Sequence, residues 1–140
     1  PAPASSNDQY LQLAWHKAFR TLIKDDNGYF MVVNLTQIDW ACRANNGNYL
    51  LSELTNLEQF IEQVYKYVGV DRRTLLIVCS SYQRGHIEWV MKNDEPDLKI
   101  LSKSVKAELV PVFANGPGAE NFTGVYKNTE LYMKIKSLLF

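Results

Sequence analysis

Apolar side chains recur at three- and four-residue steps in three stretches of the chain. These stretches are residues 8–23, 49–68 and 128–139. This spacing places the apolar side chains on one face of a helix, so each stretch is predicted to be helical. Gly69 follows the second stretch, and we expect that helix to end there because glycine readily adopts the conformation of a helix C-terminus.

Three other stretches are continuously apolar, at residues 29–33, 74–79 and 109–114. Short runs of this kind are typical of strands that are buried on both faces in a parallel sheet. Pro111 has no amide hydrogen to donate, which places the third strand at an edge or a bulge of its sheet. These runs therefore predict three strong strands.

Two weaker strands are predicted at residues 87–91 and 98–101, with residues 92–97 as the loop that joins them. Helices that alternate with buried strands indicate an α/β fold, here a three-layer α/β/α domain with a mainly parallel sheet. The small residues and prolines of residues 1–7 predict a linker, and residues 8–140 are predicted to form the domain. Because Pro1 is not a translation start, we expect the chain to derive from a longer one.

Composition excludes some classes of function and leaves others open. Lys and Arg number 15 and Asp and Glu number 15, so the net charge is zero and does not favour nucleic acid or an anionic membrane as a partner. No apolar run approaches the roughly 20 residues of a membrane-spanning helix. Cys42 and Cys79 could form one disulfide or stay reduced.

Polar side chains follow the first two apolar runs. Asn34 comes directly after residues 29–33, and Asp39 and Arg43 come next, four residues apart. Ser80, Ser81, Tyr82 and Arg84 follow the second run. The carboxyl ends of buried strands are where α/β proteins place their active sites, so these two segments are the candidates for chemistry.

Other candidates have ordinary explanations. Cys79 and Ser80 lack the G-x-S-x-G turn of a serine nucleophile, and His16 and His86 have no partner at metal-ligand spacing, so packing or surface roles are favoured. The tryptophans and tyrosines could line a binding face, but packing is the favoured role for them too; the tryptophans are Trp15, Trp40 and Trp89.

Four blocks of sequence carry a resemblance to a known family. They are residues 26–33, residues 37–46, residues 74–78, and V-P-V-F-A-N-G-P-G-A at 110–119 continued by F-T-G-V-Y-K-N-T at 122–129. In their order and in their residues these blocks resemble the C-terminal half of an alkaline phosphatase, and the last block is long and specific. The resemblance covers nearly all of residues 8–139 and implies an alkaline-phosphatase-like half domain.

The family holds two zinc ions and a magnesium ion, and the resemblance assigns their ligands to positions of this chain. The magnesium glutamate corresponds to Asn34, the first zinc aspartate to Asp39, and the zinc histidine four residues later to Arg43. Asp39 is retained, whereas Asn34 is neutral and a guanidinium has no lone pair to donate.

The remaining ligands of this half are replaced as well. The aspartate and histidine of the second strand end correspond to Ser81 and Tyr82, and the third zinc histidine falls near Val105, with no suitable side chain beside it. The nucleophilic serine belongs to the family's N-terminal half. We therefore expect vestigial metal-site positions, no bound zinc or magnesium, and an ion pair between Asp39 and Arg43 at their i, i+4 spacing.

Two functions remain open at this point. The first is a non-catalytic pseudophosphatase that serves as a binding, assembly or structural module. The second is one part of a phosphoric monoester hydrolase whose nucleophile lies on a missing N-terminal half or a partner chain. A weaker third idea is a metal-free anion site formed by the side chains of Arg43, Ser80, Ser81, Tyr82 and Arg84.

The resemblance also bears on partners and on location. In the family this half is one side of a larger sheet, and a strand edge left without its neighbour can pair with another chain. We therefore expect a protein partner, either the missing N-terminal half or a second copy in a homodimer. The family resemblance implies a periplasmic or secreted location.

Overall fold

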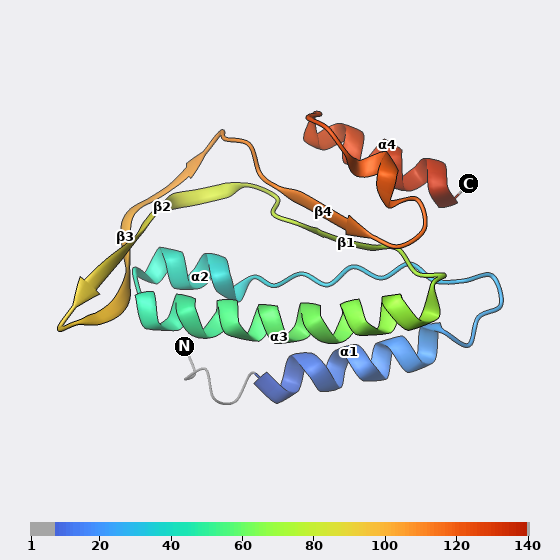
Figure 1. The fold of residues 1–140 in the computed structure, drawn as a ribbon, viewed down its shortest axis with the longest axis horizontal. Coiled ribbons are helices and arrows are strands. Elements are labelled where there is room, and N and C mark those ends of the chain that lie inside the picture. Colours follow the sequence, from blue (N-terminus) through green and yellow to red (C-terminus); the bar gives the residue numbers. More distant parts are fainter. Residues whose placement is uncertain (1–7, 140) are drawn as a thin grey trace. The chain divides into compact units, whose positions relative to one another are not determined.

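The computed structural model describes residues 8–139, with the side chains of residues 8, 9, 95 and 96 left aside. The predicted linker at residues 1–7 lies outside the described residues. The elements in chain order are α1 (Asp8–Leu22), α2 (Gln37–Ala44), α3 (Gly47–Asp71), β1 (Leu76–Cys79), β2 (Gln83–Lys92), β3 (Glu95–Lys106), β4 (Val112–Asn115), the 3-10 helix η2 (Ala119–Phe122) and α4 (Asn128–Leu139) (Figure 1).

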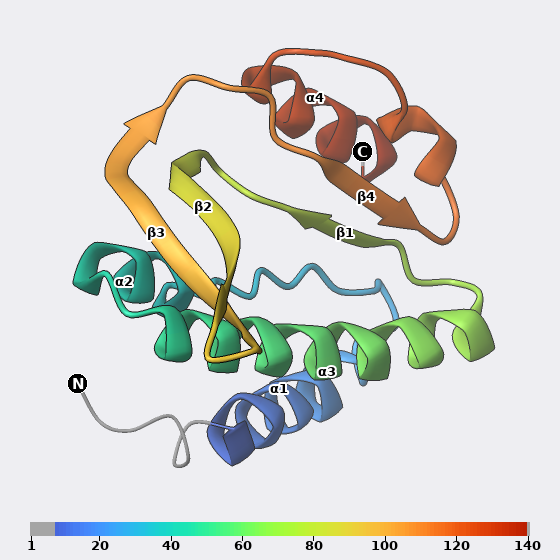
Figure 2. The same ribbon diagram turned by 60° about the vertical axis from the view of Figure 1, so that its left-hand side comes forward.

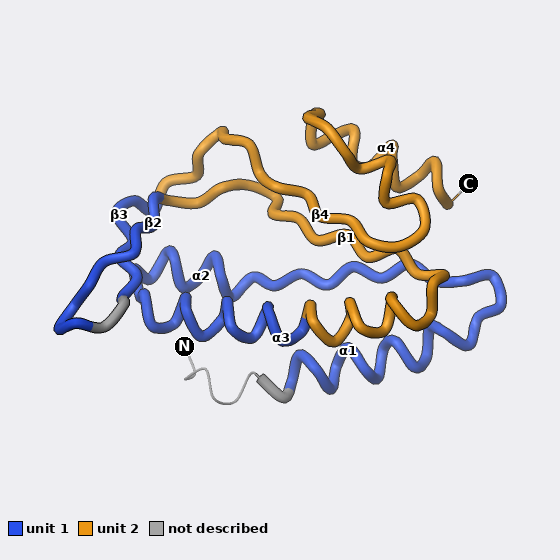
Figure 3. The backbone as a smooth tube through the Cα atoms, in the orientation of Figure 1, with its two compact units in different colours: residues 1–60, 86–103 blue, residues 61–85, 104–140 orange. Residues whose placement is uncertain are grey.

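The chain divides into two compact units (Figure 3). Unit 1 contains residues 1–60 and 86–103, and unit 2 contains residues 61–85 and 104–140. The single domain expected over residues 8–140 stays a prediction.

The core of unit 1 joins α2, the start of α3 and β3. Five buried residues form it, with Ile38 and Tyr49 packed against them; the five are Ala41, Cys42, Leu50, Leu98 and Ile100. Leu98 and Ile100 alternate along β3 and so share one face of that strand. Burial of this face against two helices gives the β3 strand a place in the hydrophobic core.

A second group of contacts in unit 1 is aromatic and holds α1 against α3. The Trp15 ring stacks on Phe19 of α1 at 5.3 Å between centroids and meets Phe60 of α3 edge-on at 5.8 Å. Tyr29, just after α1, meets Phe19 edge-on at 5.6 Å. Offset and edge-on pairs at these separations are the favoured arrangements of aromatic rings, and they hold α1 against the part of α3 that belongs to unit 1, residues 47–60.

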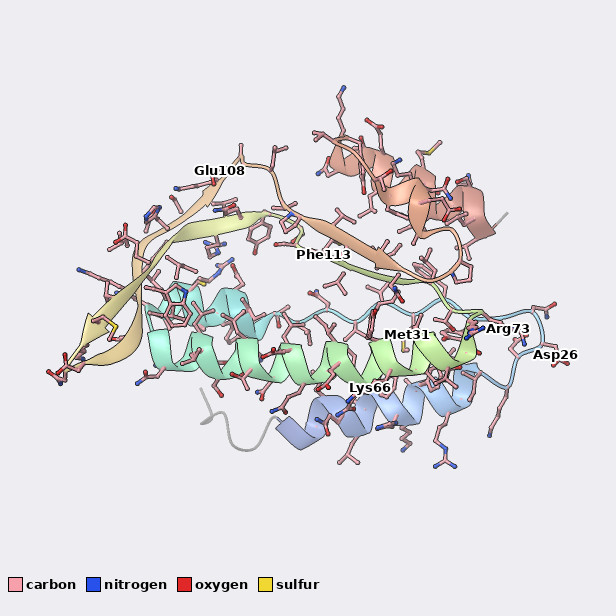
Figure 4. The ribbon with its side chains drawn as sticks, viewed as in Figure 1. Asp26, Met31, Lys66, Arg73, Glu108 and Phe113 are labelled. Carbon is pink, nitrogen blue, oxygen red and sulfur yellow. The ribbon has the colours of Figure 1, made fainter. Side chains whose placement is uncertain are left out.

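Unit 2 is built on an antiparallel pair of strands. Leu76 of β1 lies opposite Asn115 of β4, and Cys79 lies opposite Val112. Gly116 follows β4 with φ of +115°, and a Cβ atom there would lie 2.2 Å from the carbonyl oxygen of Thr74. Glycine is thus required where the chain turns beside β1. Phe113, which is the second residue of β4 and is labelled in Figure 4, is 64% exposed.

The three predicted helices are confirmed, but the second continues past Gly69 to Asp71. Arg72 adopts the left-handed conformation instead, with φ of +55°, and its amide donates to the carbonyl oxygen of Val68 at 3.0 Å. Gly69 therefore lies inside the helix and does not end it. The helix ends at Asp71, two residues later than the sequence predicted. No helix of the described residues has the length and apolar character needed to cross a membrane.

Two of the three strongly predicted strands are present in the structure, and the third is not. The run at 74–79 contains β1, and the run at 109–114 overlaps β4. The mainly parallel three-layer sheet is not confirmed, because the described strands form two sheets of two strands each, and β1 and β4 are antiparallel.

The strand expected at residues 29–33 is absent from the described structure, where this segment is irregular. Phe30 is 59% and Val32 74% exposed. An apolar run favours burial, but a strand also needs a neighbour to accept and donate its backbone hydrogen bonds, and the described strands do not provide one for this segment.

The weak strands are longer than expected. β2 and β3 extend to either side of Asn93 and Asp94 (Figure 2), so the predicted loop at residues 92–97 is reduced to two residues. Asn93 and Asp94 have φ of +53° and +62°. Two consecutive positive φ values define the type I′ turn that matches the twist of a hairpin, and asparagine and aspartate tolerate that conformation well.

Candidate functional site

Helix α2 presents the two charged residues on which the sequence analysis centred. Asp39 lies in its first turn and Arg43 in its last turn. An acid near the N-terminus and a base near the C-terminus both interact favourably with the helix dipole. Asp39 and Arg43 therefore each lie at the end of α2 where their charge stabilises the helix.

The C-terminal end of α2 is fixed by its backbone. Asn45 is left-handed with φ of +54°, and its amide donates to the carbonyl oxygen of Cys42 at 3.2 Å. The amide of Asn46 donates to Ala41 at 3.1 Å, which completes a Schellman arrangement. Asn46 then accepts the amide of Tyr49 on its side-chain Oδ1 at 2.9 Å, so it also caps α3.

Asp39 and Arg43 form the predicted ion pair. Nε of Arg43 donates to Oδ2 of Asp39 at 2.6 Å, and the side chains are 61% and 20% exposed respectively. The carboxylate is thus mostly covered, while the guanidinium reaches solvent. Whether this pair stands at a vestigial zinc position stays a prediction.

Asn34 lies elsewhere in unit 1, in a pocket of about 220 Å³. The pocket is bordered by α1, by the segment that leads into α2, and by α3; its lining residues are Tyr10, Leu11, Ala14, Asn34, Leu35, Thr36, Gln37, Ile38, Glu53, Asn56 and Leu57. Asp39 and Arg43 are not among them. Asn34 therefore lines this pocket, whereas the Asp39–Arg43 ion pair is not part of its lining.

Glu53 is a residue that sequence reasoning missed. It is only 8% exposed, lines the pocket, and is the buried charged side chain of the described residues. Its signal was its position three residues after the buried Leu50, on the apolar face of α3. A carboxylate at such a position lies against the core instead of in water.

Tyr49 responds to this burial and to this charge. Burial raises the pKa of the Tyr49 hydroxyl above its usual value, and the negative charge of Glu53 raises it further. The hydroxyl of Tyr49 donates to Oε1 of Gln37, which ties the start of α3 to the start of α2. Both effects favour the neutral, hydrogen-bonded phenol.

The second candidate segment belongs to unit 2 and is locally arranged. The Ser80 hydroxyl donates to the carbonyl oxygen of Tyr82 at 2.6 Å, and the guanidinium of Arg84 lies 5.4 Å from the centre of the Tyr82 ring. Ser81 is exposed. The anion site predicted from these residues together with Arg43 would draw on both units, and it stays a prediction.

The remaining candidates are ordinary in their surroundings. Cys42 is buried and Cys79 exposed, and the two do not form a disulfide with each other. His86 Nε2 lies 2.9 Å from Oε1 of Glu88 on the same strand, and the His16 ring lies 4.5 Å from that of Trp15. Within the described part of the chain, no three His, Cys, Asp or Glu side chains gather as a metal site.

Known proteins resemble this chain in sequence. A sequence model of the alkaline phosphatase family, described as "Alkaline phosphatase", matches residues 5–93. Alkaline phosphatase 3 of Bacillus subtilis (strain 168) is 31% identical over 68 residues, which are 49% of this chain and 15% of that protein. Alkaline phosphatase 4 of the same organism is 21% identical over 183 aligned positions, which cover 81% of this chain and 40% of that protein.

Solved structures agree with these matches. The alkaline phosphatase from the Antarctic bacterium TAB5 has a TM-score of 0.80 and is 34% identical, and the match covers 87% of this chain and 38% of that one. A mutant of the TAB5 enzyme with Mg bound in its M3 site has a TM-score of 0.75 and is 31% identical. That match covers 87% of this chain and 39% of the mutant's chain. The chain thus spans well under half the length of these relatives.

Proposed function

The chain belongs to the alkaline phosphatase family, and we propose that it is a non-catalytic member, a pseudophosphatase domain that serves as a binding, assembly or structural module. The Asp39–Arg43 ion pair at 2.6 Å carries this proposal. It joins the one carboxylate that the resemblance retains from the metal site to a permanent cation. A cation that replaces an imidazole at such a site competes with a metal for the same carboxylate.

The donor set does not fit the family's metals. Zinc sites take imidazole, thiolate and carboxylate donors in a fixed geometry, and magnesium prefers oxygen donors with negative charge. Asn34, Ser81 and Tyr82 stand at positions where the resemblance places charged or imidazole ligands. Within the described residues no three side chains of the suitable types lie together, which supports the proposal, and no catalytic step is assigned to a metal.

The test is a measurement of metal content and of activity on the same sample. The purified chain is incubated with zinc and magnesium and dialysed, its metal is counted by mass spectrometry, and its turnover of p-nitrophenyl phosphate is followed. We expect substoichiometric metal and no turnover above buffer. Stoichiometric zinc with turnover that a chelator removes would overturn the proposal.

A matched variant sharpens this test. Arg43→His restores an imidazole four residues after Asp39, whereas Lys136→His places a similar change on the exposed surface of α4, where no metal ligand stands three or four residues away. Under the proposal, Arg43→His raises zinc retention above that of Lys136→His without creating turnover, because two ligands are too few for a catalytic site. Equal zinc retention by the two variants would count against a vestigial zinc position at Arg43.

A second function is favoured by the exposure of Arg43 and by the chain's coverage of 38–40% of its longer-matched relatives. The chain could supply one part of a phosphoric monoester hydrolase, with Arg43 contacting the phosphoryl oxygens as a guanidinium can. Mixing the chain with an N-terminal half of a family member tests this idea. Restored turnover that Arg43→Ala abolishes and Arg20→Ala preserves would favour this function over the first.

Location is proposed on family resemblance alone. We place the protein in the periplasm or outside the cell, as the resemblance implies. Fractionation of the native host, followed by detection with an antibody against this chain, tests the placement. Recovery in the cytoplasmic fraction would contradict it.

A further inference from the structure

The sequence contains three asparagines that are each followed directly by a glycine. The pairs are Asn27 with Gly28, Asn46 with Gly47, and Asn115 with Gly116. In such a pair the backbone nitrogen of the glycine can attack the side-chain carbonyl carbon of the asparagine, because glycine has no Cβ to hinder the approach and its backbone turns freely. Whether the attack takes place in the folded chain depends on how firmly the fold holds each pair.

The pair at Asn46 and Gly47 is held from both sides. The side-chain Oδ1 of Asn46 accepts the amide of Tyr49 at 2.9 Å, which ties the side chain to the first turn of α3. Gly47 is so close to β3 that an added Cβ would lie 2.3 Å from the carbonyl oxygen of Leu98. Ring closure requires the backbone between the two residues to rotate, and both contacts oppose that rotation.

The pair at Asn115 and Gly116 is held by β1. Asn115 lies opposite Leu76 in the antiparallel ladder, and an added Cβ at Gly116 would lie 2.2 Å from the carbonyl oxygen of Thr74. Both residues of the pair are half-buried. A held pair reacts only after local opening, whose free energy ranges from near zero in loops to the global value in the core.

The pair at Asn27 and Gly28 lies open, in the turn after α1. Both residues are exposed, and Gly28 has φ of +92°. Among the described residues, and apart from its two chain neighbours, no heavy atom lies within 4 Å of a Cβ added at Gly28. The amide of Gly28 donates to the carbonyl oxygen of Asp25 at 3.2 Å, at the long end of the usual range. This turn therefore opposes ring closure least.

We propose that Asn27 is a site of spontaneous deamidation. The backbone nitrogen of Gly28 loses its proton to solvent and bonds to Cγ of Asn27, which closes a five-membered succinimide ring. The bond from Cγ to Nδ2 breaks, and the nitrogen takes up the proton and leaves as ammonia. The inference does not depend on the proposed function, because this turn is apart from the Asp39–Arg43 pair.

Water then opens the ring at one of its two carbonyl carbons. Addition at Cγ breaks the new bond to the nitrogen of Gly28 and gives aspartate at position 27. Addition at the backbone carbonyl carbon breaks the original peptide bond and gives isoaspartate, in which the chain continues through the side chain. The sum of the steps consumes one water and releases one ammonia, so neither an oxidant nor a reductant is needed.

The product changes the hydrogen bonding of the turn. Nδ2 of Asn27 donates to Oδ1 of Asp25 at 3.1 Å, and the amide of Asn27 donates to the same oxygen at 3.0 Å. A carboxylate at position 27 has no proton to donate and repels the carboxylate of Asp25 at this short range. Tyr29, which meets Phe19 of α1 edge-on, follows directly after this turn. Deamidation therefore replaces a bond that closes the turn with a repulsion.

Ageing of the purified full chain in water enriched in heavy oxygen, at neutral pH, tests the proposal. Samples are digested at intervals, and mass spectrometry of the peptides detects the incorporated oxygen and distinguishes isoaspartate from aspartate. We expect Asn27 to react roughly tenfold or more faster than Asn46 and Asn115, because it needs no opening of the fold. The chain unfolded in urea is the control, and there the three asparagines should react at similar rates.

Two outcomes would overturn the proposal. One is a folded chain in which Asn46 or Asn115 reacts as fast as Asn27. The other is a folded chain in which Asn27 stays unmodified over a period in which the unfolded control reacts. Asn27→Gln should abolish the fast reaction, because the longer side chain would have to close a less favourable six-membered ring.

The effect on the turn has a test of its own. Asn27→Asp reproduces one of the two products and should lower the urea concentration at which half of the chain is unfolded. The same change made in an Asp25→Asn background should lower it less, because the repulsion between the two carboxylates is then absent. An equal loss in both backgrounds would show that Asp25 does not repel the modified residue.

Discussion

Gly47 at the start of α3 lies against the backbone of Leu98 in β3. A Cβ atom at Gly47 would be 2.3 Å from the carbonyl oxygen of Leu98, a backbone atom that cannot move aside cheaply. The close approach brings the first turn of α3 to the strand that shares its core. The helix and the hairpin of unit 1 are thus held together at a position that only glycine fits.

Gly47→Ala should therefore lower the free energy of unfolding, by about 1–3 kcal/mol as for other overpacked sites. Gly69→Ala is the matched control, because no atom lies within 4 Å of its added Cβ and it is inside the same helix. That change should raise the stability by about 0.5–1 kcal/mol. Urea unfolding of the two variants measures both, and equal effects would contradict the close approach.

The Asp39–Arg43 pair should contribute little to stability despite its short distance. The guanidinium is 61% exposed, and exposed pairs of this spacing couple by about 0.2–1 kcal/mol. A double-mutant cycle with Asp39→Asn and Arg43→Gln measures the coupling energy, and it should decrease as salt is added. Coupling well above this range would mean that the pair is buried in solution.

The Glu62–Lys66 pair of α3 is the comparison for that cycle. It has the same spacing and a distance of 2.7 Å, but its carboxylate is 61% exposed where that of Asp39 is 20% exposed. We expect the weaker coupling at Glu62–Lys66, because solvent screens both partners. The reverse order would contradict the geometry of the Asp39 carboxylate.

Tyr49 should ionise later than an exposed phenol as the pH rises. Its pKa is raised above 10.0 by burial and then by the charge of Glu53. A raised pKa in the folded state means that this contribution to stability is fully present below pH 10 and is lost as the pH rises through the folded pKa. Absorbance titration at alkaline pH should show a delayed step that belongs to Tyr49.

Variants assign that delayed tyrosine. Tyr49→Phe should remove the delayed step, and Glu53→Gln should move it to lower pH by removing the nearby charge. Tyr10→Phe, at a tyrosine that is 71% exposed, should leave the delayed step in place. A delayed step that survives Tyr49→Phe would contradict the assignment.

The sequence predicted helices better than sheets, and the reasons are physical. The apolar spacing of residues 8–23 and 128–139 is a local property and was enough to locate α1 and α4. The run at residues 29–33 is as apolar as β1, but pairing depends on a neighbour that a local pattern does not specify. Conversely, β2 was underestimated because its exposed Trp89 and Met91 do not form a buried pattern.

The candidate site was predicted in part. The i, i+4 spacing of Asp39 and Arg43 was sufficient to predict their ion pair, because α2 brings such residues together by its own geometry. The burial of Glu53 and the pocket beside Asn34 depend on how α1 packs on α3. That packing involves rings far apart in the sequence, such as those of Trp15 and Phe60. The local spacing of apolar residues does not predict contacts of this kind.

Asp71 closes α3 and should make the stability of the chain sensitive to acid. Its Oδ2 accepts from the Thr74 hydroxyl at 2.7 Å and from the amide of Arg73 at 3.1 Å. The hydrogen bond from Thr74 is the main cause that lowers the pKa of Asp71 below 3.8, against the opposing effect of burial. A lowered folded pKa means that this stability is present above pH 3.8 and is lost as the pH falls through the folded value.

Asp71→Asn should therefore reduce the free energy of unfolding at neutral pH and flatten its decrease below pH 4, relative to the parent chain. Thr74→Val should reproduce part of the flattening, because it removes the largest cause of the pKa shift while leaving the amide of Arg73 in place. Urea unfolding in a series of buffers from neutral to acid pH measures the effect. Parallel pH profiles for Asp71→Asn and the parent would show that the carboxylate of Asp71 has the same pKa in the folded and unfolded chains.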